Sequence, residues 1–280
     1  MSTMTDLMNN PYIPMMAEIQ SVEPLTARET LFRVLLPEPL NHRPGQFVMV
    51  SVPGIGECAI SISSGPESGQ ILEMVIRKAG NVTGVIHQLK KSDFVGIRGP
   101  FGSGFNLSDF KNRDIVIVAG GLGLVPLRSL IIPIMDHKAD YGKVHLIIGS
   151  RTPAETLFRK QISEWKQQPD CHITELVDST EFQQWDGETG LVTDPIHKLQ
   201  LDEQNTQLVL CGPPVMYKFV LMEFKMNFNI ADEQIFVDLE RRMRCGIGKC
   251  GHCQINHVYC CKDGPVFRYS QLHDLPEALT

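Results

Sequence analysis

The sequence predicts a β-barrel plus α/β fold, in which an antiparallel β-barrel is followed by a parallel-sheet α/β domain and a small C-terminal module. Three observations support this fold class. Short apolar runs separated by Pro, Gly, Ser and Asn occupy residues 12–107, buried strands and helices alternate from residue 114, and a group of cysteines lies between residues 245 and 261. A chain of 280 residues is long for a single core and suits two domains with an appendage.

The composition is that of a globular protein. Apolar residues make up 42% and charged residues 21% of the chain, and the net charge of −6 disfavours a nucleic-acid surface. Residues 1–16 have no basic start before an apolar core, so we expect no signal peptide. The longest apolar runs are far shorter than the roughly 20 residues that span a bilayer. We therefore expect a cytoplasmic protein without membrane insertion, in which eight cysteines indicate metal binding rather than disulfides.

The first segment, residues 1–110, is expected to form a small antiparallel barrel. Its apolar runs are short, rich in Val, Ile and Phe, and bounded by turn residues, and one helix is expected at about residues 82–90. Several short strands with a single helix are typical of a small barrel. The expected strands are Leu31–Leu36, Gln46–Val52, Ala59–Ser63, Leu72–Arg77 and Phe94–Arg98.

The second segment, residues 111–228, is expected to form the α/β domain. From Asp114, the run Asp-Ile-Val-Ile-Val-Ala is continuously apolar after its first residue, as in a strand buried on both faces of a parallel sheet. Strands and helices then alternate, which is typical of this fold class. The expected elements that follow are a helix at Pro126–Met135, a strand at Val144–Ile148, a helix at Pro153–Trp165, and strands at His172–Leu176 and Gln207–Cys211.

The third segment, residues 229–280, carries the cysteine group. Cys245-Gly-Ile-Gly-Lys-Cys250-Gly-His-Cys253 has the C-x4-C-x2-C spacing of plant-type [2Fe–2S] proteins, in which a distant cysteine completes the ligand set. Its glycines allow positive φ angles and let backbone N–H groups approach the cluster sulfurs. Structural zinc is the alternative, although zinc sites favour paired C-x2–4-C arms. The spacing does not choose between Cys260 and Cys261 as fourth ligand.

Two glycine-containing loops follow expected buried strands. Gly120-Gly-Leu-Gly123 precedes a helix, where free N–H groups and close backbone approach suit a pyrophosphate. This is not the G-x-G-x-x-G pattern, so a structural turn is the alternative. Cys211-Gly-Pro-Pro-Val-Met216 lies at the carboxyl end of another strand, where α/β sheets bind ligands. Its alternative is a tight turn with Cys211 as an ordinary buried thiol.

Together these segments resemble the ferredoxin–NADP reductase superfamily over nearly the whole chain, and more narrowly its members with a C-terminal [2Fe–2S] domain. The run from Leu239 to Cys253 looks closest to the flavin subunits of cytoplasmic NAD(P)-linked [NiFe] hydrogenases, the sulfhydrogenase gamma subunits, and to heterodisulfide-reductase-linked proteins. The electron-transfer subunit of dihydroorotate dehydrogenase is a more distant relative. The segments that carry the resemblance are Ile76–Lys78 with Gly80–Thr83, Gly99–Gly102, Ala119–Arg128, Cys211–Met216, Cys245–Cys253 and Cys261–Phe267.

The resemblance implies three cofactors: FAD on the barrel, NAD(H) or NADP(H) on the α/β domain, and a [2Fe–2S] cluster in the third segment. It favours Cys261, which directly precedes Lys-Asp-Gly-Pro-Val-Phe, as fourth ligand, and it places the catalytic candidate Cys211 near the nicotinamide. The implied cluster ligands are Cys245, Cys250, Cys253 and Cys261. The implied FAD contacts are Ala59, Ile60, Ser61, Ile76, Arg77, Gly80, Asn81, Val82 and Thr83. The implied NAD(P) contacts are Gly120, Gly121, Leu122, Gly123, Arg151 and Gly212.

One departure from the family pattern concerns the flavin. The family motif usually reads Arg-x-Tyr-Ser, whereas this chain has Cys58-Ala-Ile-Ser61, without the phosphate-pairing arginine and the flavin-stacking tyrosine. We expect Arg77 to supply the missing charge. The coenzyme choice rests on Arg151 and on residues 174–197, which contain no Lys or Arg. Acidic residues there favour the unmodified ribose of NAD over the 2′-phosphate of NADP, and they are Asp178, Glu181, Asp186, Glu188 and Asp194.

The expected function is that of an electron-transfer (diaphorase) subunit. It would exchange hydride between NAD(P)H and FAD and single electrons between FAD and the cluster, because flavin converts two-electron into one-electron chemistry. Its expected partners are the iron–sulfur and catalytic subunits of a hydrogenase-type or heterodisulfide-reductase-type complex. The alternatives are an electron-transfer subunit of dihydroorotate dehydrogenase or sulfite reductase and, in a different class, a non-catalytic zinc- and nucleotide-binding assembly module.

Overall fold

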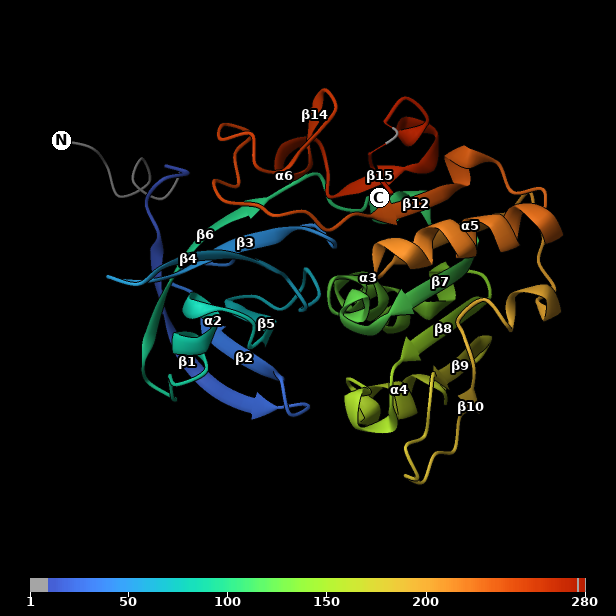
Figure 1. Cartoon of the computed structure of the whole chain (residues 1–280), viewed down its shortest axis with the longest axis horizontal. Helices are drawn as coiled ribbons and strands as arrows, with labels where there is room; N and C mark the ends of the chain where they lie inside the picture. The colour runs from blue at the N-terminus through green and yellow to red at the C-terminus, as the bar shows by residue number, and fades with distance from the viewer. Residues whose placement is uncertain (1–9, 276, 280) are drawn as a thin grey trace.

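The computed structural model describes residues 10–275 and 277–279. A curled sheet and a second, larger sheet lie side by side, and a small cysteine-bearing region covers one end of both (Figure 1). Residues 1–9, which form part of the stretch where no signal peptide is expected, lie outside the described residues. None of the described helices is long and apolar enough to cross a bilayer.

The N-terminal half forms the predicted antiparallel barrel. Its six strands pair in the order β4-β3-β6-β1-β2-β5, and the edge strands β4 and β5 contact each other, which closes the sheet. The short helix α2 (Asn81–Ile86) packs on β3 and β4. The sequence missed β1, because its inward residues alternate with polar ones and form no apolar run. The strands are β1 (Met15–Pro24), β2 (Glu29–Leu35), β3 (Phe47–Val52), β4 (Gly56–Ser61), β5 (Ile71–Arg77) and β6 (Phe94–Phe101).

The second sheet has seven strands in the order β10-β9-β8-β7-β11-β12-β15, and every neighbouring pair except β12–β15 is parallel. Alternate residues of β7 face two cores. One core contains residues of α3 (Leu124–Asp136) and α4 (Arg159–Trp165), and the other contains residues of α5 (Pro214–Asn227). The strands are β7 (Asp114–Gly120), β8 (Val144–Ser150), β9 (Cys171–Val177), β10 (Glu188–Thr189), β11 (Thr206–Cys211), β12 (Ile235–Asp238) and β15 (Val266–Arg268).

The helix expected at residues 153–165 is divided. A 3₁₀ turn covers Pro153–Glu155, and α4 begins only at Arg159, because Phe158 adopts a left-handed conformation (φ 54°) that interrupts helical geometry. The remaining short elements join the strands and build the C-terminal region. The 3₁₀ turns are Leu107–Asp109, Gly121–Gly123, Lys138–Asp140, Pro153–Glu155, Ile196–Lys198, Asp232–Gln234 and Tyr269–Leu272, and the other elements are β13 (Gln254–Ile255), β14 (Val258–Tyr259) and α6 (Cys260–Asp263).

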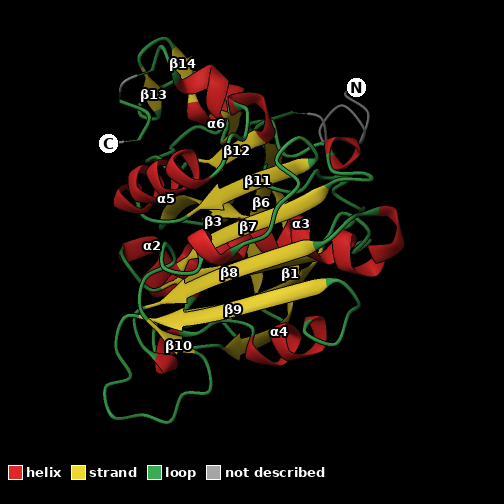
Figure 2. Ribbon diagram, turned by 90° about the vertical axis from the view of Figure 1, so that its right-hand side faces the viewer, coloured by secondary structure: helices red, strands yellow, loops and turns green. Residues whose placement is uncertain are grey.

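The cysteine-bearing segment is built onto the second sheet. β12 continues the parallel ladder, and β15 pairs with it antiparallel through Val237 and Phe267. Figure 2 shows the β13–β14 hairpin and α6 beyond the β12 edge of this sheet. The strands that carry the cysteine loops are therefore hydrogen-bonded to the strands that end at the nucleotide loops.

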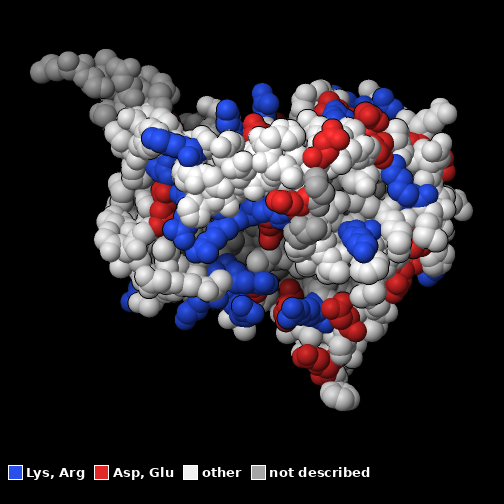
Figure 3. Space-filling model, turned by 45° about the horizontal axis from the view of Figure 1, so that its top comes forward, with Lys and Arg blue, Asp and Glu red and all other residues white. Residues whose placement is uncertain are grey.

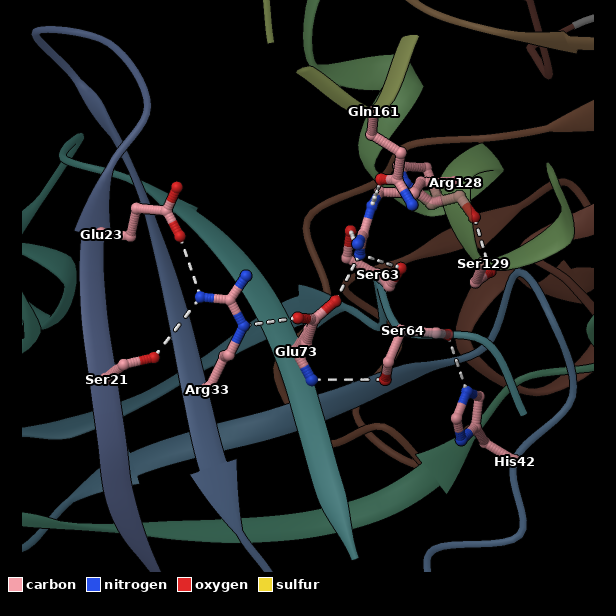
Figure 4. A network of polar contacts seen from close by, with 11 residues as sticks. Ser21, Glu23, Arg33, His42, Ser63, Ser64, Glu73, Arg128, Ser129 and Gln161 are labelled. Atoms are coloured by element: carbon pink, nitrogen blue, oxygen red, sulfur yellow. Dashed lines mark hydrogen bonds and ion pairs between the residues drawn. The ribbon is translucent and has the colours of Figure 1, made fainter. Parts of the chain in front are cut away.

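A buried arginine joins the barrel to the α/β domain (Figure 4). Arg128 on α3 donates to the carbonyl oxygen of Ser63 at 2.8 Å and to Glu73 on β5 at 2.6 Å. It also donates to Gln161 on α4 at 2.6 Å, and Glu73 accepts a second bond from Arg33 at 2.6 Å. Because the Arg128 side chain is only 8% exposed, this network fixes how the two domains face each other.

Candidate functional site

A hollow of about 740 Å³ lies between the two domains. On the α/β side it is bounded by the segments that follow β7, β8, β9, β11 and β12, so it lies at the carboxyl ends of the parallel strands, where such sheets bind ligands. On the barrel side it is lined by Arg28, Glu29 and Arg77. Among the residues expected to contact cofactors, those that line the hollow are Arg77, Gly120, Gly121, Leu122, Gly123, Arg151 and Gly212.

The loops after β7 and β11 touch each other at glycines. A Cβ on Gly123 would lie 2.2 Å from the carbonyl oxygen of Cys211, so no other residue fits there without moving the backbone. A Cβ on Gly120 would likewise lie 2.6 Å from the sulfur of Met216. Directly after Gly123 the helix α3 begins, and its first turn carries N–H groups without helical partners. The two loops thus form a cradle whose chemistry suits a pyrophosphate.

Charged residues of both signs line the hollow after β8 and β9. Arg151, Glu155 and Asp178 all line the hollow, and the N–H of Asp178 donates to the carbonyl oxygen of Ser150 at 3.0 Å. This bond holds the end of β9 beside the β8 loop. Of the acidic residues that the sequence analysis associated with the coenzyme, only Asp178 lines the hollow, whereas Glu181, Asp186, Glu188 and Asp194 are not among its lining residues.

The strand β4 occupies the position of the flavin motif. Its residues 57–61 are half-buried, and Cys58 and Ile60 pack on the barrel core next to Val82 of α2. Burial raises the pKa of the Cys58 thiol to about 11, so this residue is neutral near pH 7 and does not replace the charge of the family arginine. Ala59 packs on the opposite side, against the core that contains Cys253 and Cys261.

Arg98 pairs with Glu57 of β4, and two further arginines of the barrel line the hollow. Arg77 forms an ion pair with Glu29, and Arg28, from the turn between β1 and β2, lines the same hollow. The sequence analysis expected Arg77 and missed Arg28, which no motif marks. At the start of α2, Thr83 Oγ1 accepts hydrogen bonds from the N–H groups of Ala79 and Gly80 at 3.0 and 2.9 Å.

These features fit a bulky anionic dinucleotide. No atom lies within 4 Å of the Cβ position of Gly80, so the approach to the start of α2 is open. A half-buried apolar strand lies nearby, and two cations line the adjoining hollow. Ile76 is the exception among the expected contacts, because its side chain is buried in the barrel core and only its backbone is left to contact a ligand.

Cys211, the expected catalytic residue, is fully buried at the end of β11 and is not among the residues that line the hollow. Burial, followed by the charges of Asp238 and Glu240, raises the pKa of its thiol. The neighbouring Tyr217 hydroxyl accepts from the N–H of Gly212 at 3.2 Å and donates to the carbonyl oxygen of Asp238. Through this tyrosine, the loop after β11 is fastened to the end of β12.

Backbone N–H groups surround the thiols of the C-terminal segment, as the sequence analysis expected. Gly248 donates to the sulfur of Cys261 at 3.1 Å, Lys249 donates to Cys245 at 3.4 Å, and Cys261 donates to Cys253 at 3.4 Å. The loop turns at three glycines with positive φ, and these are Gly246 (78°), Gly248 (69°) and Gly251 (77°). Such N–H groups stabilise the sulfurs of an iron–sulfur cluster.

The two adjacent cysteines have different surroundings. Cys260 donates its S–H to the carbonyl oxygen of Leu239 at 3.5 Å and lies in the core, whereas Cys261 accepts from Gly248 and hydrogen-bonds with Cys253. Burial, followed by this bond, raises the pKa of Cys261 to about 12. The geometry therefore favours Cys261 over Cys260 as a ligand.

The thiols form two pairs, Cys253 with Cys261 and Cys245 with Cys250. Burial raises the pKa of Cys245, but N–H groups of the loop and the bond to Cys250 lower it to about 6, which favours a thiolate. Within residues 10–275 and 277–279, no three His, Cys, Asp or Glu side chains are grouped as a single metal ion requires. Two pairs of thiols with N–H donors fit a two-iron cluster better than one zinc ion.

Two family models match separate parts of the chain. A family described as the oxidoreductase NAD-binding domain matches residues 117–221, and the iron–sulfur cluster binding domain of dihydroorotate dehydrogenase B matches residues 240–273. The chain is 39% identical to sulfhydrogenase 1 subunit gamma of Pyrococcus furiosus, over 97% of this chain and 96% of that protein. It is 33% identical to a probable dihydroorotate dehydrogenase B electron transfer subunit of the same organism, over 85% of this chain and 84% of that protein.

Solved structures share the fold. A chain of NADH-dependent reduced ferredoxin-NADP oxidoreductase superposes with a TM-score of 0.75 and 23% identity, over 94% of this chain and 92% of that chain. The ferredoxin reductase in carbazole 1,9a-dioxygenase superposes with a TM-score of 0.67 and 22% identity, over 80% of this chain and 68% of that one. The second structure matches less of this chain than the first.

Proposed function

Because this chain belongs to the family of electron-transfer subunits that includes the sulfhydrogenase gamma subunits, we propose that it links an NAD(H) pool to the catalytic subunit of a hydrogenase-type complex. Its fold is that of the ferredoxin–NADP reductases, and it is an NAD(P)H-dependent oxidoreductase subunit that works with FAD, a [2Fe–2S] cluster and a nicotinamide coenzyme. Its partners are other subunits of a redox complex.

The observation that carries the proposal is the closeness of the hollow to the thiol pairs. Glu240 lines the hollow two positions after the end of β12, and the first expected ligand, Cys245, follows only five positions later in the same segment. On the other side, Arg98 of β6 donates to the carbonyl oxygen of Cys245 at 3.3 Å. A nucleotide site and a cluster site joined by so short a segment are suited to electron transfer within one chain.

In this proposal FAD, when bound, exchanges hydride with the nicotinamide and passes electrons singly to the cluster. The residues of the chain bind and orient these cofactors. Arg28 and Arg77 would contact the FAD phosphates, the loop 120–123 and Gly212 would hold the nicotinamide coenzyme, and the four cysteines Cys245, Cys250, Cys253 and Cys261 would hold the cluster. The side chain of Cys211 is buried and does not line the hollow, so we assign it no direct contact with the coenzyme.

The proposed coenzyme is NAD rather than NADP. Asp178 and Glu155 line the same end of the hollow as Arg151, so a 2′-phosphate there would meet two carboxylates and one cation. A 2′-hydroxyl can instead donate to Asp178. We expect Asp178→Asn to narrow the preference for NADH over NADPH, measured as the ratio of the two kcat/KM values, and an unchanged ratio would contradict this assignment.

The experiment that tests the function is an anaerobic titration of the purified chain with NADH, followed by absorption and electron paramagnetic resonance spectroscopy. We expect flavin bleaching together with the signal of a one-electron-reduced [2Fe–2S] cluster. The matched variants Cys261→Ser and Cys260→Ser sharpen the test, because only the first should abolish the cluster signal. A protein that contains stoichiometric zinc and neither flavin nor cluster would overturn the proposal.

A second partner class has an observation in its favour. The family match at residues 240–273 is to the iron–sulfur domain of dihydroorotate dehydrogenase B, and relatives with that name are similar over most of the chain. Affinity purification of the tagged chain from its own cells distinguishes the two. A nickel-containing partner supports the hydrogenase assignment, and a partner that oxidises dihydroorotate supports the other. A heterodisulfide-reductase-type partner, also expected from the sequence, would appear in the same experiment as a thiol-forming activity.

A further inference from the structure

Positive charge is concentrated in the loop that carries the expected cluster ligands. Five of the 26 Lys and Arg residues lie between Arg241 and Lys262, and none of the 32 Asp and Glu residues does, in a chain whose net charge is −6. On the face of the molecule that carries this segment, Lys and Arg gather in the left half along a hollow, while most Asp and Glu lie to the right and below (Figure 3). The charge is therefore segregated rather than evenly mixed.

Four of these cations are exposed, and we refer to Arg242, Arg244, Lys249 and Lys262 as the basic face. None of the four forms an ion pair with another residue that the structure describes, so no carboxylate neutralises their charges there. Arg242 and Arg244 alternate with half-buried residues in the loop that leads to Cys245. Cys250 lies directly after Lys249 and is the one expected ligand that is exposed. The basic face thus surrounds the edge of the cluster site that solvent reaches.

Apolar surface adjoins the basic face. Tyr12 is 58% exposed, and the Lys249 ammonium lies 5.5 Å from the centre of its ring. Beside it, a second hollow of about 200 Å³ is lined by Asn10, Pro11, Ile13, Met15 and residues 97–101. Arg98, one of its lining residues, donates to the carbonyl oxygen of Cys245, so this hollow borders the ligand loop. An aromatic residue among arginines beside a hollow is typical of protein–protein interfaces.

We propose that the basic face is the docking surface for an acidic patch on the iron–sulfur subunit that exchanges electrons with this chain. This inference rests on the proposed function, because it assigns the partner of the same cluster. Opposite charges would steer the partner so that its redox centre meets the exposed edge at Cys250, and the apolar surface around Tyr12 would exclude water once contact is made. Electron-transfer contacts are small, so a few cations suffice to set the orientation.

The test uses rubredoxin, a small acidic one-electron protein, as probe of the full-length holoprotein, with basic cytochrome c as its counterpart. One NADH is oxidised to NAD⁺ with release of one proton, and two ferric rubredoxins are reduced to the ferrous state. We expect Arg242→Glu/Arg244→Glu to lower kcat/KM for rubredoxin about tenfold or more at low ionic strength and to raise it for cytochrome c. The difference should shrink at high salt, where the screening length falls to about 3 Å.

The matched control is Lys90→Glu/Lys91→Glu. It changes the net charge by the same amount but lies before β6, at the end of that strand away from Arg98 and the ligand loop. Both double variants are therefore also compared at physiological ionic strength, where the screening length is about 8 Å. There the control should leave the rubredoxin kinetics within about twofold of wild type, because Lys90 and Lys91 precede the far end of β6. An equal loss in both double variants would mean that only net charge matters, and it would overturn the proposal.

A second readout does not depend on turnover. We expect the dissociation constant of immobilised rubredoxin, measured by surface plasmon resonance at low salt, to rise in Arg242→Glu/Arg244→Glu and not in the control. If NADH still reduces the cluster of that variant while both rubredoxin measurements stay at wild-type values, the docking assignment fails and the proposed function stands. If NADH does not reduce the wild-type cluster, the proposed function itself fails. Preferential binding to phosphatidylserine vesicles over rubredoxin would assign the face to a membrane and overturn the proposal.

Discussion

Two carboxyl groups, the partly buried Glu73 on β5 and the buried Asp238 on β12, have opposite electrostatic surroundings. Glu73 accepts hydrogen bonds from Arg128 and Arg33, both at 2.6 Å, and these cations outweigh its burial and lower its pKa. Asp238 has no cation partner among the described residues, and its Oδ2 has no hydrogen-bond partner there either. Burial, followed by the charge of Glu240, raises its pKa.

The difference shows what each position contributes. The negative charge of Glu73 on the barrel is neutralised by Arg128 of α3, and this ion pair helps to hold the barrel against α3. It thereby sets how the two sides of the hollow face each other. Asp238 ends the strand that leads to Glu240 and the cysteine loop, and its neighbour Tyr217 fastens the loop at Gly212. A carboxyl group kept protonated at this point avoids placing an unpaired negative charge under the nucleotide loops.

The largest effect on stability is expected when the ion pair between Arg128 and Glu73 is broken. Arg128→Met should lower the free energy of unfolding by about 3–5 kcal/mol, because Glu73 is left partly buried with a single, partly exposed cation. Urea unfolding followed by circular dichroism measures this change. Lys111→Met is the control, since its pair with Asp140 is about half exposed and should contribute less than ~1 kcal/mol. Equal changes in both variants would show that the domain contact does not depend on Arg128.

Asp238, the carboxyl group without a cation partner among the described residues, should make the stability of the protein depend on pH. As the pH rises above its ordinary value of 3.8, Asp238 ionises in the unfolded chain but stays protonated in the folded one, so the wild-type protein loses stability relative to Asp238→Asn. The difference should grow by up to about 1.4 kcal/mol per pH unit until the folded group ionises. Thermal unfolding of both proteins from acidic to alkaline pH measures it, and parallel curves would contradict the assignment of a protonated Asp238.

This comparison also marks the limit of prediction from sequence. The cysteine loop was predictable, because its ligands, its glycines and its N–H donors all lie within one short segment whose spacing is specific. The buried strands β7 and β11 were also predictable, since each contains a continuous apolar run, Ile115–Ala119 and Leu208–Cys211. The pair Arg128–Glu73 joins residues 55 positions apart, and no local sequence pattern around either residue indicates that the two side chains meet.

Only some of the residues that line the hollow could likewise be predicted from the sequence. Its glycine loops were marked by their own sequence, whereas Arg28 comes from an ordinary turn and Glu240 reaches the hollow only because β12 extends the parallel sheet. The pairing of β15 with β12 is also invisible locally, because three residues carry no periodic pattern. The side chain of Cys211 has its orientation set by packing, which spacing does not encode.

The smallest effect is expected at the outer end of the ion-pair network around Glu73. Arg33→Met should cost less than ~1 kcal/mol at neutral pH, because its side chain is 35% exposed and Arg128 still neutralises Glu73. Loss of one cation should move the pKa of Glu73 back toward its ordinary value of 4.5, so the stability that its ionised form contributes is lost at a higher pH on acidification. Acid unfolding of the variant should therefore begin at higher pH than that of the wild-type protein. A loss as large as that of Arg128→Met would mean that both arginines act as one buried unit, and the distinction between the inner and outer ends of the network would disappear.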